Sequence, residues 1–112
     1  MEVKRGDVVI AVAAGDYGKP RPVVVVQSDV YNPTHSSIVV CPITSHLVAA
    51  PLFRLTLLPA PGNGLEAESQ IMIDKLTALR ADRIRKRIGT LRPSEMRALD
   101  RALRVWLALD SR

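Results

Sequence analysis

The chain has 112 residues, of which 47% are hydrophobic and 24% are charged, a balance typical of folded globular proteins and not of disordered ones. A chain of this length removes roughly 65% of its unfolded surface from water, enough for one stable domain and too little for two. We therefore expect residues 1–112 to form a single domain. No apolar run approaches the ~20 residues of a membrane helix, and residues 1–6 lead into no signal-like segment. These features predict a cytoplasmic protein without a membrane partner.

The net charge of +5 and the isoelectric point near 10.0 favour a polyanionic partner such as nucleic acid. The excess is concentrated near the end of the chain. Residues 1–79 carry six Lys or Arg against seven Asp or Glu, whereas residues 80–112 carry ten against four. A basic terminal segment also suits an acidic protein partner or a solvated surface, so charge alone does not choose among these.

The chemistry available to cysteine and histidine is limited. Cys41 is the only cysteine and ends an aliphatic run, so we expect a buried strand residue rather than a nucleophile, and no disulfide within the chain. His35 and His46 lie eleven residues apart, with no further His or Cys at metal-ligand spacing. The sequence therefore predicts no metal site and no cofactor.

The first two thirds of the chain predict short strands separated by turn residues, a pattern typical of a small barrel. The predicted strands are residues 7–13, 22–27, 37–41, 52–58 and 70–73. Three of them are almost wholly aliphatic, which indicates burial on both faces, whereas the alternation in 52–57 directs Phe53, Leu55 and Leu57 inward. Residues 15–20 and 59–64 are predicted loops. Residues 83–88 suit a last strand, with its isoleucines inward and Arg85 and Arg87 outward.

From Pro93 onward the pattern predicts a helix. Pro93 suits the first helical position, and Glu95 can reach back to the free backbone N–H groups there. Apolar side chains cover an arc of roughly 200° around this helix, about twice what packing on one surface requires. We therefore expect the helix to be covered from two directions, by the barrel and by a second subunit.

Short motifs along the whole chain resemble, in order and spacing, the signatures of MazF/PemK toxins of type II toxin-antitoxin systems. Gly64-Leu65, Ser69 and the acid Asp74 fit the same pattern. The longer motifs are KRGDVV at 4–9, GKPRPVVVVQ at 18–27, CPITS at 41–45 and IGTL at 88–91. CcdB-like gyrase poisons share the fold and part of this pattern.

The resemblance implies a mainly β fold with a C-terminal helix, an SH3-like small barrel of the MazF/CcdB type, assembled as a homodimer. It also implies an endoribonuclease that cuts single-stranded mRNA at short sequences without metal. In that reaction the ribose 2′-OH attacks the adjacent phosphorus and leaves 2′,3′-cyclic phosphate and 5′-OH ends. A cognate antitoxin is the implied partner, its acidic, flexible segment lying over the basic surface and groove.

Arg21 matches the arginine of the family's Arg-Pro motif, where its planar set of donors would hold two oxygens of the scissile phosphate. The prolines on both sides restrict its backbone and argue against an idle, solvated loop arginine. Thr44 matches a family threonine that helps to position the phosphate, and Ser45 offers a second hydroxyl. Without the resemblance, both would be read as ordinary turn residues.

The source of the proton chemistry is open. Some relatives carry a loop histidine or a second arginine, and this chain has residues 16–17 (Asp-Tyr) and Met72 there, so the second cationic group is absent. An arginine keeps its proton at neutral pH, so Arg21 is suited to binding charge and poorly suited to moving protons.

His46 is the candidate base, because histidine is the residue type most often used for proton transfer near neutral pH, although a loop histidine is more often structural or solvated. Asp74 would orient Arg21 or receive the 2′-OH proton, and a strand-end acid without a role is an equal alternative.

Candidate RNA contacts come from the loops and strand ends. Tyr17 and Tyr31 are placed to stack on bases. Lys19, Gln27 and Ser45 add polar contacts, although for Gln27 a solvated strand end is the simpler interpretation.

Two other functions remain open from the sequence. A CcdB-like toxin would bind gyrase through its terminal helix and would need no catalytic residues. An SH3-like adaptor for RNA or protein would leave the pairing of Arg21 with Thr44 unexplained.

Overall fold

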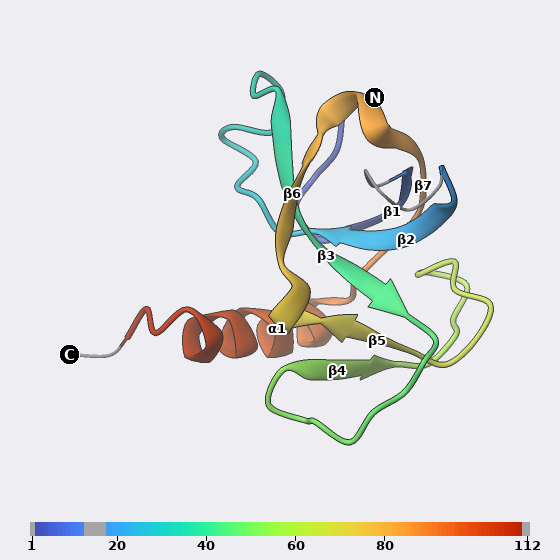
Figure 1. The fold of residues 1–112 in the computed structure, drawn as a ribbon, viewed down its shortest axis with the longest axis vertical. Coiled ribbons are helices and arrows are strands. Elements are labelled where there is room, and N and C mark those ends of the chain that lie inside the picture. Colours follow the sequence, from blue (N-terminus) through green and yellow to red (C-terminus); the bar gives the residue numbers. More distant parts are fainter. Residues whose placement is uncertain (1, 13–17, 111–112) are drawn as a thin grey trace.

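The computed structural model describes residues 2–12 and 18–110, and it shows a curved β-sheet packed against a C-terminal helix (Figure 1). The strands are β1 (Asp7–Val12), β2 (Pro20–Val25), β3 (Ser37–Thr44), β4 (Arg54–Leu57), β5 (Ser69–Met72), β6 (Thr77–Arg80) and β7 (Ile84–Thr90). The helix is α1 (Pro93–Trp106), and short 3-10 helices at Ile73–Lys75 and Ala81–Arg83 flank β6. The predicted mainly β fold with a C-terminal helix is confirmed.

The strands pair antiparallel in the order β4-β5-β3-β2-β1-β7, with β6 also on β3. Besides β2, β3 pairs with two further strands, because residues 37–40 pair with β6 and residues 43–44 pair with β5. The register between β1 and β7 shifts twice, and such irregularities bend and twist a sheet. The sheet therefore curls, as Figure 1 shows, into the small barrel-like body that the sequence predicted.

The central strands are buried on both faces, as their aliphatic runs predicted. Val8 and Val24 face one side, where they form a cluster with Leu99 of α1. Val9 and Val23 face the other side and form a second cluster. All five side chains are buried, and because successive strand residues alternate between faces, one sheet supplies both cores.

Cys41 is fully buried in β3, as expected for a strand residue. Burial raises the pKa of its thiol to about 12, so the thiol stays protonated near neutral pH. A protonated, enclosed thiol is unsuited to nucleophilic chemistry.

Two strand boundaries differ from the prediction in a way that matters for function. β2 begins at Pro20, where residue 22 was expected, and β3 continues to Thr44, where residue 41 was expected. β1 supplies the partner for the early part of β2, with Val12 opposite Pro20, and a proline is tolerated at the first position of a strand. Arg21 and Thr44 therefore lie on strands, not in the predicted loop and turn.

The remaining differences concern short elements. The predicted strand 52–58 is shortened to β4, β5 begins one residue before its predicted start, and β6 and the 3-10 helices were not predicted. β6 has the sequence Thr-Ala-Leu-Arg with only Leu79 buried, so it offers little of the alternation that marks a strand. The first predicted strand included residue 13, which lies outside the described residues.

α1 begins as its sequence predicted. The backbone N–H of Arg92 donates to Oε1 of Glu95 at 2.8 Å, which caps the first turn. Leu99, Ala102 and Leu103 are buried against the sheet. In the part of the chain that the structure describes, no helix is long and apolar enough to cross a membrane.

Candidate functional site

A hollow of about 500 Å³ opens where the sheet meets the loop 58–68, and we call it the polar hollow. β2 contributes Arg21, the end of β3 contributes Thr44 and Ser45, and β7 contributes Lys86. The structure thus brings together Arg21, Thr44 and Ser45, which the sequence predicted to act on one phosphate. The described lining residues are Ile10, Arg21, Pro22, Ile43, Thr44, Ser45, Gly64, Leu65, Glu66, Ala67, Ser69, Lys86 and Ile88.

Arg21 is held by the strand that carries it. Its backbone pairs opposite Ala11 of β1, and the prolines on both sides fix their own φ angles and favour an extended backbone before them. Its side chain is exposed and also lines a second hollow of about 310 Å³. This apolar hollow is otherwise lined by Ala11, Val23, Val40, Pro42, Met72, Lys75, Thr77 and Leu79. Arg21 therefore stands between a polar and an apolar space.

Thr44 is oriented by the turn that follows it. Its Oγ1 accepts a hydrogen bond from the backbone N–H of His46 at 3.0 Å. A hydroxyl carries one proton and two lone pairs, so this bond leaves the proton of Thr44 to be donated. The arrangement suits contact with an anionic oxygen in the polar hollow.

The loop 58–68 is held in place from within. Asn63 is buried, its Nδ2 donates to the carbonyl of Leu58 at 2.9 Å, and its Oδ1 accepts from the N–H of Leu65 at 3.0 Å. The N–H of Thr90 in β7 donates to the carbonyl of Gly62 at 2.8 Å. The wall that the loop gives to the hollow is therefore fixed to the sheet.

Two glycines allow the close approach of this loop to β7. Gly64 has a positive φ of 69°, and a Cβ there would overlap the carbonyl of Ile88. A Cβ at Gly89 would overlap the main chain at Gly62 and Asn63. Only residues without a side chain fit at both positions.

Asp74 lies in a different setting. Arg54 donates from Nε to Oδ1 at 2.8 Å and from Nη2 to Oδ2 at 3.0 Å, and the exposed fractions of the two side chains are only 13% and 17%. The hydrogen bonds from Arg54 hold the pKa of the Asp74 carboxyl below its usual range, and Asp74 raises the pKa of Arg54.

Comparison with known proteins decides the family. Residues 4–107 match the family described as PemK-like, MazF-like toxin of type II toxin-antitoxin system. The chain belongs to this family.

Two relatives extend over nearly the whole chain. The chain is 41% identical over 108 residues to a probable endoribonuclease MazF of Mycolicibacterium smegmatis, covering 96% of this chain and 98% of the relative. It is 33% identical to endoribonuclease EndoA of Bacillus subtilis, covering 97% of each.

Solved structures show the same fold. The Mycobacterium tuberculosis toxin MazF-mt6 superposes with a TM-score of 0.79 at 24% identity, over 91% of this chain and 96% of that one. A chain from a MazE-MazF structure of Deinococcus radiodurans gives 0.78 at 19% identity, over 96% of each. The predicted family and its barrel fold are confirmed.

In this PemK/MazF-like chain, Asp74 lies away from the hollow in which we expected it to act. Asp74 does not line the polar hollow, and both of its carboxylate oxygens accept from Arg54. The expectation that Asp74 orients Arg21 or takes the 2′-OH proton therefore lacks geometric support. Sequence reasoning missed Arg54 because the pair is twenty residues apart on separate elements.

The other predicted contacts are dispersed. His46 is exposed and lies outside the polar hollow, as does the exposed Lys19. Gln27 accepts at Oε1 from the N–H of Val39, at 3.1 Å, so its amide serves the local fold. Tyr17 lies outside the described residues.

Arg21 lies near the start of β2, whereas Gln27 and the exposed Tyr31 come after its end. At about 3.3 Å per strand residue, Gln27 is roughly 20 Å from Arg21 along the strand. Within one chain, these residues do not meet the polar hollow.

Lys86 and Glu66 line the polar hollow and were not predicted there. A signal for Lys86 was present, because it lies midway between Ile84 and Ile88, which were predicted to face inward. Regular alternation would put all three on one face, but the register shifts of β7 place Ile84 against one core and Ile88 against the other.

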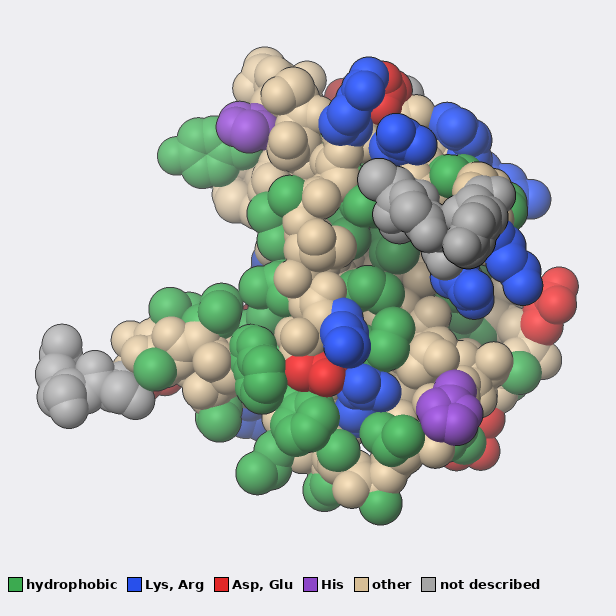
Figure 2. Space-filling view, in the orientation of Figure 1, with side chains coloured by type: hydrophobic (Ala, Val, Ile, Leu, Met, Phe, Trp, Pro, Cys, Tyr) green, Lys and Arg blue, Asp and Glu red, His purple; other side chains and the backbone are tan. Residues whose placement is uncertain are grey.

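Basic side chains cover much of the β7 side of the chain. Figure 2 shows Lys and Arg gathered on this side of the barrel. Arg85, Lys86 and Arg87 are all exposed. Arg87 lies 3.5 Å from Oδ2 of Asp7, and Nη1 of Arg85 donates to the carbonyl of Asp82 at 2.7 Å.

Proposed function

We propose that this PemK/MazF-like toxin is an endoribonuclease that cuts single-stranded mRNA at specific short sequences without a metal ion. The products would carry 2′,3′-cyclic phosphate and 5′-OH ends. The observation that carries the proposal is the meeting of Arg21 and Thr44 in one polar hollow. The names of the M. smegmatis and B. subtilis relatives support it.

The chemistry follows from the charge that builds during the reaction. As the 2′-OH attacks the phosphorus in line, negative charge grows on the non-bridging oxygens and on the leaving 5′-oxygen. Arg21 donates two parallel hydrogen bonds to the non-bridging oxygens, and Thr44 donates its hydroxyl proton to one of them. Preorganised donors of this kind lower the barrier by roughly 3 to 4 kcal/mol each.

Cleavage of a long RNA in EDTA by the purified protein tests the proposal. We expect cutting at a small set of sites, cyclic phosphate at the new 3′ ends, and loss of cutting in Arg21→Ala. The matched control is Arg97→Ala, since Arg97 is exposed on α1 and lines neither hollow. Equal cutting by Arg21→Ala and the natural chain would contradict the mechanism. Absence of cutting by either, with inhibited DNA supercoiling, would favour a CcdB-like gyrase poison.

We also propose a homodimer formed through the end of α1. Val105, Trp106, Leu107 and Leu109 are exposed by 68%, 47%, 46% and 65%, although soluble chains rarely expose such a group together. The ring of Trp106 lies 5.4 Å from that of Phe53, which continues the apolar surface toward β4. Figure 2 shows hydrophobic side chains in both places.

Light scattering tests the dimer. Leu109→Glu places a charge on this apolar surface without touching the buried face of α1, and we expect it to halve the mass in solution. Arg101→Glu, at an exposed polar position of the same helix, is the control. A natural chain that stays monomeric at micromolar concentration would refute the dimer.

A cognate antitoxin completes the proposal. Structures with this fold include an endoribonuclease in complex with its cognate antitoxin from Mycobacterial species. An acidic, flexible segment would be attracted to the basic β7 side and would cover the polar hollow. We expect such an antitoxin to compete with RNA, which is measured as a rise in the KM for cleavage with kcat unchanged.

A further inference from the structure

Lys86 is a second cation in the polar hollow. It is an exposed residue of β7 that lines the same space as Arg21 and Thr44. Among the described residues, no carboxylate lies within ion-pair distance of its Nζ. Arg85 and Arg87, its neighbours in the strand, have contacts with Asp82 and Asp7.

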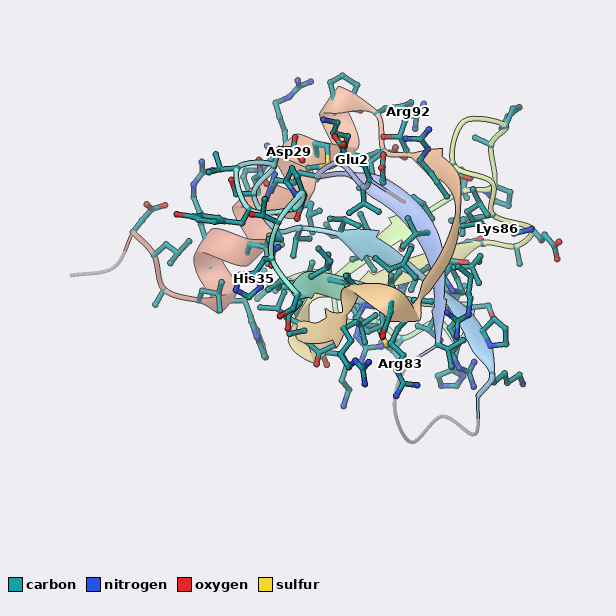
Figure 3. The ribbon with its side chains drawn as sticks, turned by 90° about the horizontal axis from the view of Figure 1, so that it is seen from above. Glu2, Asp29, His35, Arg83, Lys86 and Arg92 are labelled. Atoms are coloured by element: carbon teal, nitrogen blue, oxygen red, sulfur yellow. The ribbon has the colours of Figure 1, made fainter. Side chains whose placement is uncertain are left out.

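The strand register fixes the distance between Lys86 and the Arg21 region. Ile10 of β1 stands opposite Pro22 on one side and opposite Lys86 on the other. Since neighbouring strands are about 4.8 Å apart, the backbone of Lys86 lies roughly 10 Å from that of Pro22, across the hollow. In Figure 3, Lys86 extends from β7 beside the loop 58–68, on the side away from α1.

The charged residues that line the hollow indicate a role for Lys86. The described lining contains two cationic residues, Arg21 and Lys86, and the anionic Glu66. Without Lys86 the formal charges of Arg21 and Glu66 would cancel within the described lining. With Lys86 the formal charge is positive.

We propose that Lys86 binds a phosphate of the RNA strand next to the scissile phosphate held by Arg21. This inference rests on the proposed ribonuclease function and adds the second phosphate contact to it. Because β1 lies between the strands that carry Arg21 and Lys86, we assign the two cations to two neighbouring phosphates. Lys86 would anchor the strand in register with Arg21.

The salt dependence of RNA binding tests this contact. Each cation that neutralises a phosphate of a single strand contributes about −0.7 to the slope of log K against log salt. The probe is an oligonucleotide containing the mapped cleavage site, with 2′-deoxyribose at the scissile position to prevent cutting. We expect Lys86→Gln to weaken binding roughly three- to tenfold at low salt and to reduce the slope by about 0.7.

Kinetics and matched variants separate this role from a general loss of charge. Lys86→Gln should raise KM with kcat nearly unchanged, and Lys86→Arg should restore both KM and the slope. Arg97→Gln removes the same charge outside the hollow and should leave both unchanged, whereas Glu66→Gln should tighten binding. The inference would be overturned if the slope were unchanged in Lys86→Gln or if Arg97→Gln had an equal effect. Cutting of RNA by the natural chain would still support the nuclease function in that case. A natural chain that neither binds nor cuts RNA would instead refute the proposed function.

Discussion

Two arginines illustrate how one residue type serves two purposes in this chain. Arg54 is the first residue of β4, and its mostly buried side chain donates to both carboxylate oxygens of Asp74. Arg21 is exposed at the start of β2 and lines two hollows. The Arg54–Asp74 pair is a closed arrangement inside the fold, whereas the polar hollow opens toward a ligand.

The two arginines differ in what their charge does: that of Arg54 stabilises the fold, and that of Arg21 faces a hollow. A buried pair compensates its own desolvation, so removing one partner leaves an uncompensated charge. Arg21, in contrast, is exposed and lines the hollow in which we propose that an anion binds. We therefore expect substitutions at Arg54 to change stability and substitutions at Arg21 to change catalysis, and the following predictions test that division.

The largest effect is expected for Arg21→Ala on RNA cleavage. Loss of the Arg21 side chain, counted as one preorganised group that costs about 3 to 4 kcal/mol, should lower kcat/KM by a few hundred- to roughly a thousandfold. The free energy of unfolding should change by less than about 0.5 kcal/mol, as is usual for exposed positions. Parallel kinetics and urea denaturation check both parts. A large loss of stability would show that Arg21, like Arg54, stabilises the fold, and would contradict the proposed division.

Arg54→Ala should show the opposite pattern. Breaking the pair strands the Asp74 carboxylate in a mostly buried position, and we expect a loss of about 2 to 3 kcal/mol in the free energy of unfolding. Cleavage by the remaining folded protein should stay within about threefold of the natural chain. Arg80→Ala is the control, because the Arg80–Asp82 pair is well exposed and should contribute less than about 1 kcal/mol.

Thr44→Val should have an intermediate effect. It removes the hydroxyl proton and keeps the shape of the side chain, so we expect kcat to fall roughly 10- to 100-fold. The same change removes the acceptor for the N–H of His46, at a cost of about 1 kcal/mol in stability. Thr44→Ser should recover most of the rate. Rates that are equal in the valine variant and the natural chain would exclude the hydroxyl from the reaction.

The pH dependence of stability should depend on Asp74. Hydrogen bonds from Arg54 lower the pKa of this carboxyl in the folded state, so its stabilisation is present above the ordinary value near 3.9 and is lost as pH falls through the lowered pKa. The difference in unfolding free energy between the natural chain and Asp74→Asn should therefore be full at pH 6 and shrink below about pH 4. Urea denaturation across this range measures it. Asp82→Asn, in the exposed Arg80–Asp82 pair, is the control for the substitution itself.

The smallest effect is expected at His46. Its side chain is exposed and does not line the polar hollow, so His46→Ala should leave both the rate and its pH profile nearly unchanged. The backbone N–H that contacts Thr44 remains in this variant. Loss of a titration step near pH 6 to 7 would instead return His46 to the reaction as its base.

Most of the fold could be predicted from the sequence because short local patterns mark its strands and its helix. Aliphatic runs marked the doubly buried strands, and Pro93 with Glu95 marked the start of α1. β6 was not predicted because only Leu79 in it is buried, so the strand lacks an alternating pattern.

The candidate site was predictable only in part. Arg21 and Thr44 were found through motifs, although both were assigned to the wrong local structure. Glu66, Lys86 and the partner of Asp74 depend on contacts between distant segments, which no local pattern encodes.

The glycines that join the loop 58–68 to β7 affect how this protein can evolve. A methyl group at Gly64 or Gly89 would force two main chains apart, so neither position can drift independently of the other segment. Glu66 and Ala67 beside them are exposed and line the polar hollow. The backbone of this wall therefore stays fixed while its side chains can change, so the lining of the hollow can vary without rebuilding the barrel.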